Sequence, residues 1–287
     1  MPDVQDPQER SWFEAGASAD AAALQMREWR PQREAVGGIY LLHGLGEHSG
    51  RYGALAHWLV ARGLWVRAHD HRGHGASQGA RGVIDHPRRF VADARAKIEA
   101  FAQTLGQPPL LLGHSMGGAL AAELVVAEAL PVAGLVLSAP ALAVPIGAPM
   151  RLLVSLLTRL APSLALGNGL DAAYLSHDAA QVKAYREDPL VHDRISPRLL
   201  GWLLQAGERA RAGAAGLSVP ALVLMAGDDR MVANEGAQAF CAAASPQRLS
   251  ARLYEGLHHE LFNELPASRA QVLADFGAWL DAHLPRV

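Results

Sequence analysis

Disulfides and a marked excess of one charge are lacking in this sequence. Its 287 residues include one cysteine, Cys241, so an internal disulfide framework is excluded and apolar packing must hold the fold. The 26 Lys and Arg residues nearly balance the 28 Asp and Glu residues, giving a net charge of −2. Because the chain has no cationic field for a phosphate backbone, we expect no nucleic-acid partner.

No secretory signal peptide is expected, because the first residues have neither a basic nor an apolar region. Residues 129–150 form an uncharged stretch of 22 residues, which is long enough to suggest a membrane span. Prolines interrupt this stretch, however, and proline removes backbone donors that a helix in lipid needs. The stretch is therefore interpreted as a buried strand and loop, and we expect a cytoplasmic protein.

Short apolar segments alternate with amphipathic helical patterns. Strands are predicted at residues 38–42, 64–68, 110–112, 135–137, 221–225 and 249–254. Helices are predicted around residues 90–101 and 272–283, where apolar side chains recur every three or four positions. This alternation predicts an α/β fold with a mostly parallel, doubly wound sheet. The first thirty residues are expected to add an antiparallel hairpin at the sheet edge.

A long segment, residues 141–216, breaks the alternation and shows no clear strand. A leucine stripe over 152–160 predicts one helix, and Ser196-Pro197 supplies the N-cap and first-turn proline of another. We therefore predict a helical insertion at 141–216, in a core made of residues 1–140 and 217–287.

The segment Gly113-His114-Ser115-Met116-Gly117-Gly118 directly follows the strand predicted at 110–112. A serine flanked by glycines two residues away on each side, at a strand-to-helix turn, is the pattern of a nucleophile elbow. Larger side chains at the glycine positions would collide with the backbone of so sharp a turn. Ser115 is predicted to project above the carboxyl edge of the sheet, where a helix over 117–128 presents free amides to an oxyanion.

A serine nucleophile needs a histidine base that is oriented by a carboxylate, and in this type of fold both follow the serine in the chain. Asp228 and Asp229 follow one predicted strand, and the next predicted strand precedes His258 and His259. The residues alone leave open which member of each pair acts. Asp70 is a weaker candidate for the acid, because it precedes the serine and lies in a glycine-rich turn.

The loop His43-Gly44-Leu45-Gly46 follows the strand at 38–42 and is comparable to the oxyanion loop of esterases. We predict that the backbone N–H groups of Leu45 and Met116 point at the same substrate oxygen. A dinucleotide-binding loop is the alternative, but it would need glycine at the position of Ser49.

Three nearby histidines, His69, His71 and His74, suggest a metal site. A metallohydrolase pattern of this kind would place an acid directly before the last histidine, where Gly73 stands. We therefore favour a polar structural turn and predict neither a metal nor an organic cofactor.

Five blocks of the sequence, taken together, are typical of one enzyme family. They lie at residues 43–52, 70–77, 113–118, 188–190 and 254–259. With them the chain resembles the monoacylglycerol lipase and lysophospholipase type of α/β-hydrolase, within the serine aminopeptidase S33-like hydrolases, over about residues 24–284. The resemblance implies the α/β-hydrolase fold, with the insertion at 141–216 as a cap over the acyl channel.

The resemblance also implies roles for individual residues. It makes Ser115 the nucleophile, Asp229 the acid and His259 the base. It places the oxyanion hole at Leu45 and Met116.

Further residues are implied at the alcohol end of the pocket. Glu47, Arg51 and His114 are expected to bind substrate there. Phe262 departs from the pattern, because some relatives have a histidine near the glycerol at this position. This departure weakens a strict preference for monoacylglycerol.

The function implied is hydrolysis of lipid carboxylic esters through an acyl-enzyme, with monoacylglycerol cleaved to glycerol and fatty acid. Lysophospholipase and general carboxylesterase activity are the alternatives, and a catalytically silent ligand-binding module is the alternative of a different class. The leucine stripe over 152–160 is expected to be buried against the core, to line the acyl pocket or to contact a membrane transiently. The sequence does not indicate an oligomeric state.

Overall fold

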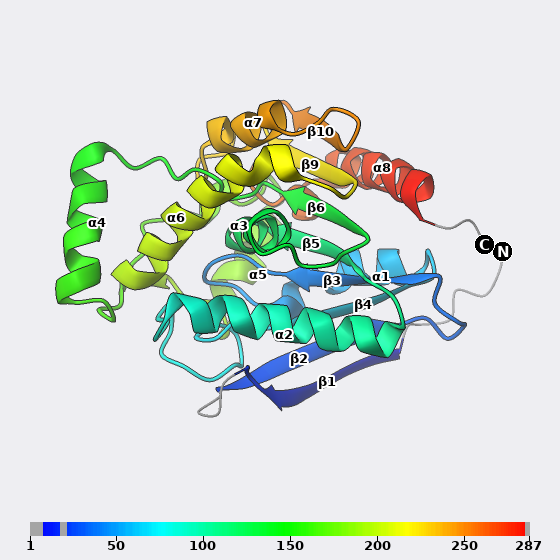
Figure 1. Cartoon of the computed structure of the whole chain (residues 1–287), viewed down its shortest axis with the longest axis horizontal. Coiled ribbons are helices and arrows are strands. Elements are labelled where there is room, and N and C mark those ends of the chain that lie inside the picture. The colour runs from blue at the N-terminus through cyan, green and yellow to red at the C-terminus, as the bar shows by residue number, and fades with distance from the viewer. Residues whose placement is uncertain (1–7, 18–21, 285–287) are drawn as a thin grey trace.

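A computed structural model describes residues 8–17 and 22–284, and it contains one eight-stranded sheet (Figure 1). The strands are, in sheet order, β1 (Gln8–Ala15), β2 (Ala23–Arg30), β4 (Leu64–His69), β3 (Gly37–Leu42), β5 (Leu110–His114), β6 (Gly134–Ser138), β9 (Ala221–Ala226) and β10 (Leu249–Tyr254). From β4 to β10 all neighbours are parallel, whereas β1 and β2 are antiparallel to their neighbours. The predicted doubly wound sheet and its edge hairpin are confirmed, and residues 1–7 and 18–21 of the hairpin region lie outside the described residues.

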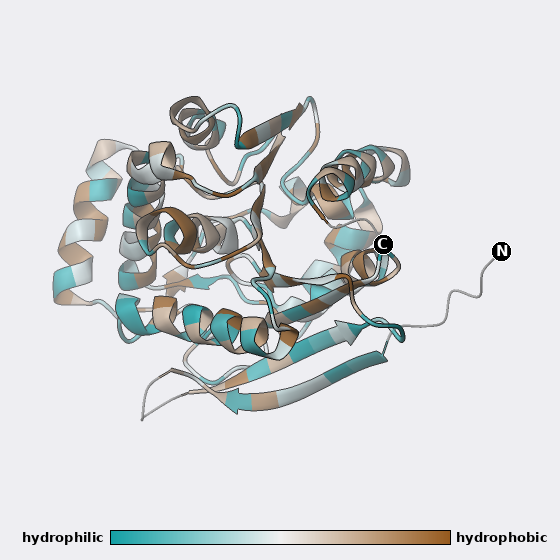
Figure 2. Ribbon diagram, turned by 45° about the vertical axis from the view of Figure 1, so that its right-hand side comes forward, coloured by the Kyte–Doolittle hydropathy of each residue, from teal (hydrophilic) through white to brown (hydrophobic). Residues whose placement is uncertain are grey.

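Helices cover both faces of this sheet, which explains why its central strands are apolar throughout. The helices are α1 (Gly53–Val60), α2 (Pro87–Leu105), α3 (Met116–Ala122), α4 (Ala148–Leu160), α5 (Ala179–Glu187), α6 (Pro197–Gly213), α7 (Asn234–Ala243) and α8 (Pro266–His283). One core cluster joins the sheet to α2, α3, α6 and α7, and the other joins it to α1 and α8. Figure 2 shows the resulting brown, apolar strands at the centre of the molecule.

Alternate residues of each strand enter opposite clusters, as the two-residue period of a strand requires. In β3, Tyr40 and Leu42 join the first cluster, whereas Ile39 and Leu41 join the second. The sheet therefore forms a rigid platform from which the loops at its carboxyl edge project.

The helix predicted over 117–128 is α-helical only as far as Ala122, and residues 123–127 form a π-helical turn. Glu123 opens this turn, and its buried carboxylate accepts hydrogen bonds from Trp202 and Arg209 of α6. The wider turn thus occurs where this helix is tied to α6.

The segment 141–216 enters between β6 and β9 and contains α4, α5 and α6. It also contains a two-stranded ladder that the sequence did not indicate, formed by β7 (Leu166–Gly167) and β8 (Arg194–Ile195). Because each strand has only two residues, a periodic pattern could not reveal them. The N-cap of α6 is Ser196, as predicted, and α6 contributes Trp202 and Leu203 to the first core cluster.

The leucine stripe of α4 is not buried against the core. Leu152 and Leu160 are each 73% exposed, and Leu156 is 50% exposed. Instead, α4 contacts α6 through its opposite face, where Val154 is buried and Thr158 bonds to the backbone of Pro197. Figure 1 shows α4 at the left end of the molecule, beside α6 and away from the sheet. Burial, one of the expected roles of the stripe, is therefore wrong, because the stripe faces away from α6.

Within the described residues, no helix combines the length and the apolar character that crossing a bilayer requires. The uncharged stretch over 129–150 instead supplies the buried strand β6 and the loop that leads to α4.

We expect Ser196→Ala to lower the free energy of unfolding by about 1 kcal/mol, because it removes an N-cap. The Ser196 hydroxyl accepts from the Leu199 N–H in a buried setting, so the amide would lose its acceptor. Urea unfolding measures the change. Ser250→Ala, at an exposed position of β10, is the control and should change stability by less than about 0.5 kcal/mol. Equal effects of the two substitutions would contradict the capping role.

Candidate active site

The turn between β5 and α3 holds Ser115 in a conformation that few non-glycine residues adopt, with φ 53° and ψ −119°. A Cβ atom at Gly113 would lie 2.3 Å from the Gly117 carbonyl oxygen. A Cβ atom at Gly117 would lie 2.2 Å from the carbonyl oxygen of Leu42. Both glycines are therefore required by close backbone approach, which is the physical basis of the elbow pattern.

Ser115 lines a cavity of about 330 Å³. The predicted site residues that share this cavity are Leu45, Glu47, His114 and His259. From the segment 141–216, the cavity is lined by Asn168, Leu170, Ala172, Leu175, Tyr185, Arg186, Asp188, Val191, His192 and Asp193. The core and the inserted segment thus enclose one cavity around the serine.

Asp229 lies behind the wall of this cavity and binds His259. Its Oδ2 atom is 2.7 Å from Nδ1 of His259, and neither side chain is more than 3% exposed. Its Oδ1 atom accepts the backbone N–H groups of Met231 and Val232. These bonds fix the carboxylate, which in turn holds the imidazole of His259 through Nδ1 at the wall of the cavity.

The neighbouring residues have other contacts. Asp228 is half-buried and lies beside Arg230 and His258, and the His258 ring stacks on His177 with centroids 3.7 Å apart. The structure therefore pairs Asp229 with His259, a choice that the residues alone left open.

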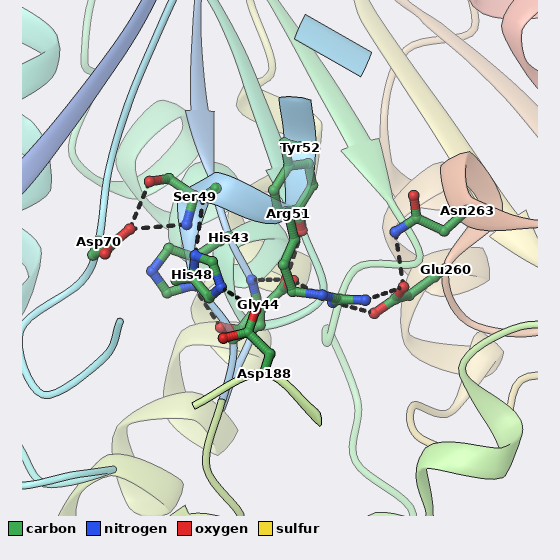
Figure 3. Close-up of polar contacts among 12 residues, drawn as sticks. His43, Gly44, His48, Ser49, Arg51, Tyr52, Asp70, Asp188, Glu260 and Asn263 are labelled. Carbon is green, nitrogen blue, oxygen red and sulfur yellow. Dashed lines mark hydrogen bonds and ion pairs between the residues drawn. The ribbon is translucent and has the colours of Figure 1, made fainter. Parts of the chain in front are cut away.

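Asp70, the weaker candidate for the acid, holds a turn instead. Its carboxylate accepts hydrogen bonds from the N–H and hydroxyl of Ser49 (Figure 3). It also accepts one from the N–H of Ala76.

The charges around His259 favour its protonated form. Burial lowers the pKa of His259, but the carboxylate of Asp229, helped by Glu260 and Glu47, outweighs it and raises the pKa above 6.5. Burial raises the pKa of Asp229, but His259 and two backbone N–H groups bring it below its ordinary value. Burial, and then the proximity of His259, lower the pKa of His114 to about 3, so this ring is neutral.

The loop after β3 brings a backbone amide close to Ser115. The Gly44 N–H donates to Oε1 of Glu47, and a Cβ atom at Gly44 would lie 3.3 Å from the Ser115 Cβ. Among the described residues, the N–H groups of Leu45 and Met116 have no hydrogen-bond acceptor. Free amides of this kind, near a serine, can stabilise an oxyanion.

Glu47 lines the cavity, but Arg51 does not. Its guanidinium bonds to Oε2 of Glu47 at 2.7 Å and forms a fork with both oxygens of Glu260, at 2.5 and 2.8 Å (Figure 3). The hydroxyl of Tyr52 and the amide of Asn263 complete the network. Arg51 thus ties the loop of Glu47 to the loop that carries His259.

Sequence reasoning missed Glu260 and Tyr185 as residues of the site. Glu260 directly follows His259, and this adjacency was the one available signal. Tyr185 lies in α5. No local pattern indicates that Cζ of Arg51 lies 4.7 Å from the centroid of its ring.

The histidines near position 70 form a buried polar cluster. Tyr40 bonds to His69, and His71 bonds to His69 and to the His43 carbonyl. Burial above all lowers the pKa of His69 and of His74 to about 3. These contacts are those of a structural turn of neutral rings.

We expect Asp229→Asn to lower the pKa of His259, because the carboxylate that stabilises the imidazolium is lost while burial continues to oppose it. NMR titration of the histidine rings measures this pKa. Asp228→Asn is the matched control and should leave the pKa of His259 unchanged. If the pKa were the same in Asp229→Asn as in the wild type, Asp229 would not be its electrostatic partner.

Comparison with known proteins shows which proteins and which family this chain is similar to. The chain is 36% identical to monoglyceride lipase from Homo sapiens, over 92% of this chain and 88% of the human protein. It is 35% identical to monoacylglycerol lipase from Mycolicibacterium smegmatis, over 89% of this chain and 92% of that protein. The crystal structure of monoacylglycerol lipase from Paleococcus ferrophilus matches with a TM-score of 0.80 and 33% identity, over 97% of this chain and 100% of that chain. The family described as serine aminopeptidase, S33, matches residues 33–266. The chain therefore belongs to the serine aminopeptidase S33 family, and it has the α/β-hydrolase fold.

Proposed function

We propose that the protein hydrolyses monoacylglycerols to glycerol and fatty acid, with Ser115, His259 and Asp229 as its catalytic triad. The observation that carries this proposal is the buried Asp229–His259 hydrogen bond, with His259 lining the same cavity as Ser115. The curated relatives that carry the name monoglyceride or monoacylglycerol lipase, matched over most of both chains, support the substrate class.

In the proposed mechanism, His259 accepts the proton of Ser115 as the serine oxygen attacks the ester carbonyl. The N–H groups of Leu45 and Met116 stabilise the tetrahedral oxyanion, a contribution of about 3 kcal/mol for each donor. His259 then protonates the leaving alcohol. Water attacks the acyl-enzyme with His259 again as the base, and the fatty acid leaves.

The cavity offers both a polar and an apolar part for such a substrate. Leu170, Leu175 and Val191 supply apolar surface for the acyl chain. Glu47 and His114 line the cavity beside Ser115 and are proposed to contact the alcohol.

Arg51 is proposed to act as a positioning residue rather than to touch the substrate, because its guanidinium is occupied by Glu47 and Glu260. Phe262 packs on Phe276 and is 8% exposed, so it adds no polar contact for glycerol. Because glycerol lacks a polar contact at this position, lysophospholipase and general carboxylesterase activity remain the alternatives.

The segment 141–216 is proposed to act as a cap, since many of its residues line the cavity over Ser115. We further propose that α4 contacts a lipid surface transiently and that the protein works in the cytoplasm, at the membrane periphery. The exposed leucines of α4 support this contact, because an amphipathic helix can bury its apolar face in a bilayer interface.

A fluorophosphonate probe tests the triad, because it labels an activated serine. We expect labelling of the wild type, none of Ser115→Ala, and a fall in kcat of about 10⁴-fold in Asp229→Asn. Asp228→Asn is the matched control and should keep its rate within a fewfold of the wild type. A wild type that stays unlabelled would favour the alternative of a silent binding module.

A panel of esters tests the substrate. Shortening the acyl chain of a monoacylglycerol from about twelve carbons to about four should lower kcat/KM, because each buried CH₂ contributes about 0.8 kcal/mol. Glycerol, lysophospholipid and simple alkyl esters of one acyl chain then compare head groups. Equal kcat/KM for long and short chains would exclude a lipid substrate, and faster turnover of lysophospholipid would favour that alternative.

A further inference from the structure

A second cluster of ligand-type side chains lies outside the cavity of Ser115. It consists of His177, from the segment 141–216, and of His258 and Glu264 from the core. One ligand atom from each residue lies within 4.8 Å of the other two. Both histidines also line a separate open cavity of about 490 Å³ that adjoins α5. No step proposed for ester hydrolysis uses these three residues.

The ring of His258 presents one nitrogen to a carboxylate, and its face stacks on the ring of His177 with centroids 3.7 Å apart. Its Nε2 atom is 3.5 Å from Oδ2 of Asp228, so the carboxylate favours a proton on that nitrogen. The Nδ1 atom then carries a lone pair, and it is buried without a hydrogen-bond partner among the described residues. A carboxylate behind the far nitrogen of a histidine is the arrangement that fixes the tautomer of zinc ligands.

Glu264 supplies the acidic ligand. Its side chain is fully buried and held by the backbone N–H groups of His177, His258 and Leu265. Its Oε1 atom lies 2.9 Å from Nδ1 of His177. This carboxylate is therefore fixed in place, with one imidazole already directed at it.

We propose that His177, His258 and Glu264 bind a Zn²⁺ ion. Two imidazole nitrogens and one carboxylate oxygen suit zinc, and three protein ligands leave a fourth position for water. The open cavity beside the histidines gives water access to that position.

Binding requires the His177 ring to rotate out of its stack on His258, because two nearly parallel rings cannot direct their in-plane lone pairs at one ion, and it requires the cluster to contract. A tetrahedral zinc ion holds its ligand atoms about 3.4 Å apart, closer than the widest separation in the cluster. The His177 side chain is 39% exposed and has room to move, whereas Glu264 is fixed. Zinc would take the place of the hydrogen bond between Nδ1 of His177 and Oε1 of Glu264.

The site would join the inserted segment to the loop beside His259. These two parts already meet there, because the Glu260 N–H donates to the Leu175 carbonyl and the Ser176 hydroxyl donates to the Asn263 carbonyl. Leu175 also lines the cavity of Ser115. Zinc would therefore reinforce one wall of that cavity, whatever ester the cavity accepts.

Thermal unfolding of the metal-free full chain with added ZnCl₂ tests the proposal. We expect one zinc ion per chain and a rise in Tm of about 5 °C when zinc is at about 100 times Kd. His177→Ala should abolish the rise, measured against its own zinc-free Tm. His57→Ala removes an exposed histidine of α1 and should keep the full rise.

Two further measurements locate the ion. Asp228→Asn should weaken zinc binding by about 10- to 100-fold, as loss of a carboxylate behind a ligand does. Zinc should also slow hydrogen exchange in residues 174–178 and 256–265 more than elsewhere. The proposal would be overturned by no rise in the wild type, by an equal rise in His177→Ala, or by a rise lost in His57→Ala.

Discussion

The buried hydrogen bond between Asp229 and His259 joins the ends of two neighbouring strands, β9 and β10. Ser115 follows β5, and Leu45 follows β3, so four loops at the carboxyl edge of one parallel sheet supply the site. Parallel strands place all their carboxyl ends on one edge, and this is where ligands bind in open α/β sheets. The sheet fixes the positions of these four loops relative to one another, so the Asp229–His259 pair stays close to the loop of Ser115.

A network of buried charges supports this arrangement. Arg51 bridges Glu47, which accepts the N–H of Gly44 in the loop after β3, and Glu260, which adjoins His259. Removing charges from water is costly, and breaking one partner of a buried pair leaves an uncompensated charge. The two loops are thus coupled, and the same carboxylates also raise the pKa of His259. Arg51 therefore contacts both loops although it does not line the cavity.

Local patterns predicted those features that depend on neighbouring residues in the chain. The strands, the edge hairpin and the Ser196 cap of α6 were confirmed, because apolar periodicity and capping are short-range effects. Of the roles expected for the leucine stripe of α4, burial against the core was wrong, since the pattern shows that a helix has an apolar face but not what covers that face. The ladder of β7 and β8 is too short to have a period.

The sequence by itself determined the α/β architecture and the sharp turn at Ser115. The turn needs glycine at positions 113 and 117, because the neighbouring backbone leaves no room for a Cβ atom there. The residues alone left open whether Asp228 or Asp229 meets His259, and the family resemblance indicated Asp229. The tertiary structure shows the contact itself, and only the tertiary structure brings His177 to His258 and Glu264. Adjacent residues have the same neighbours in sequence and differ in the direction of their side chains. That direction depends on how distant loops pack, and contacts across about 30 or more positions leave no periodic trace in the chain.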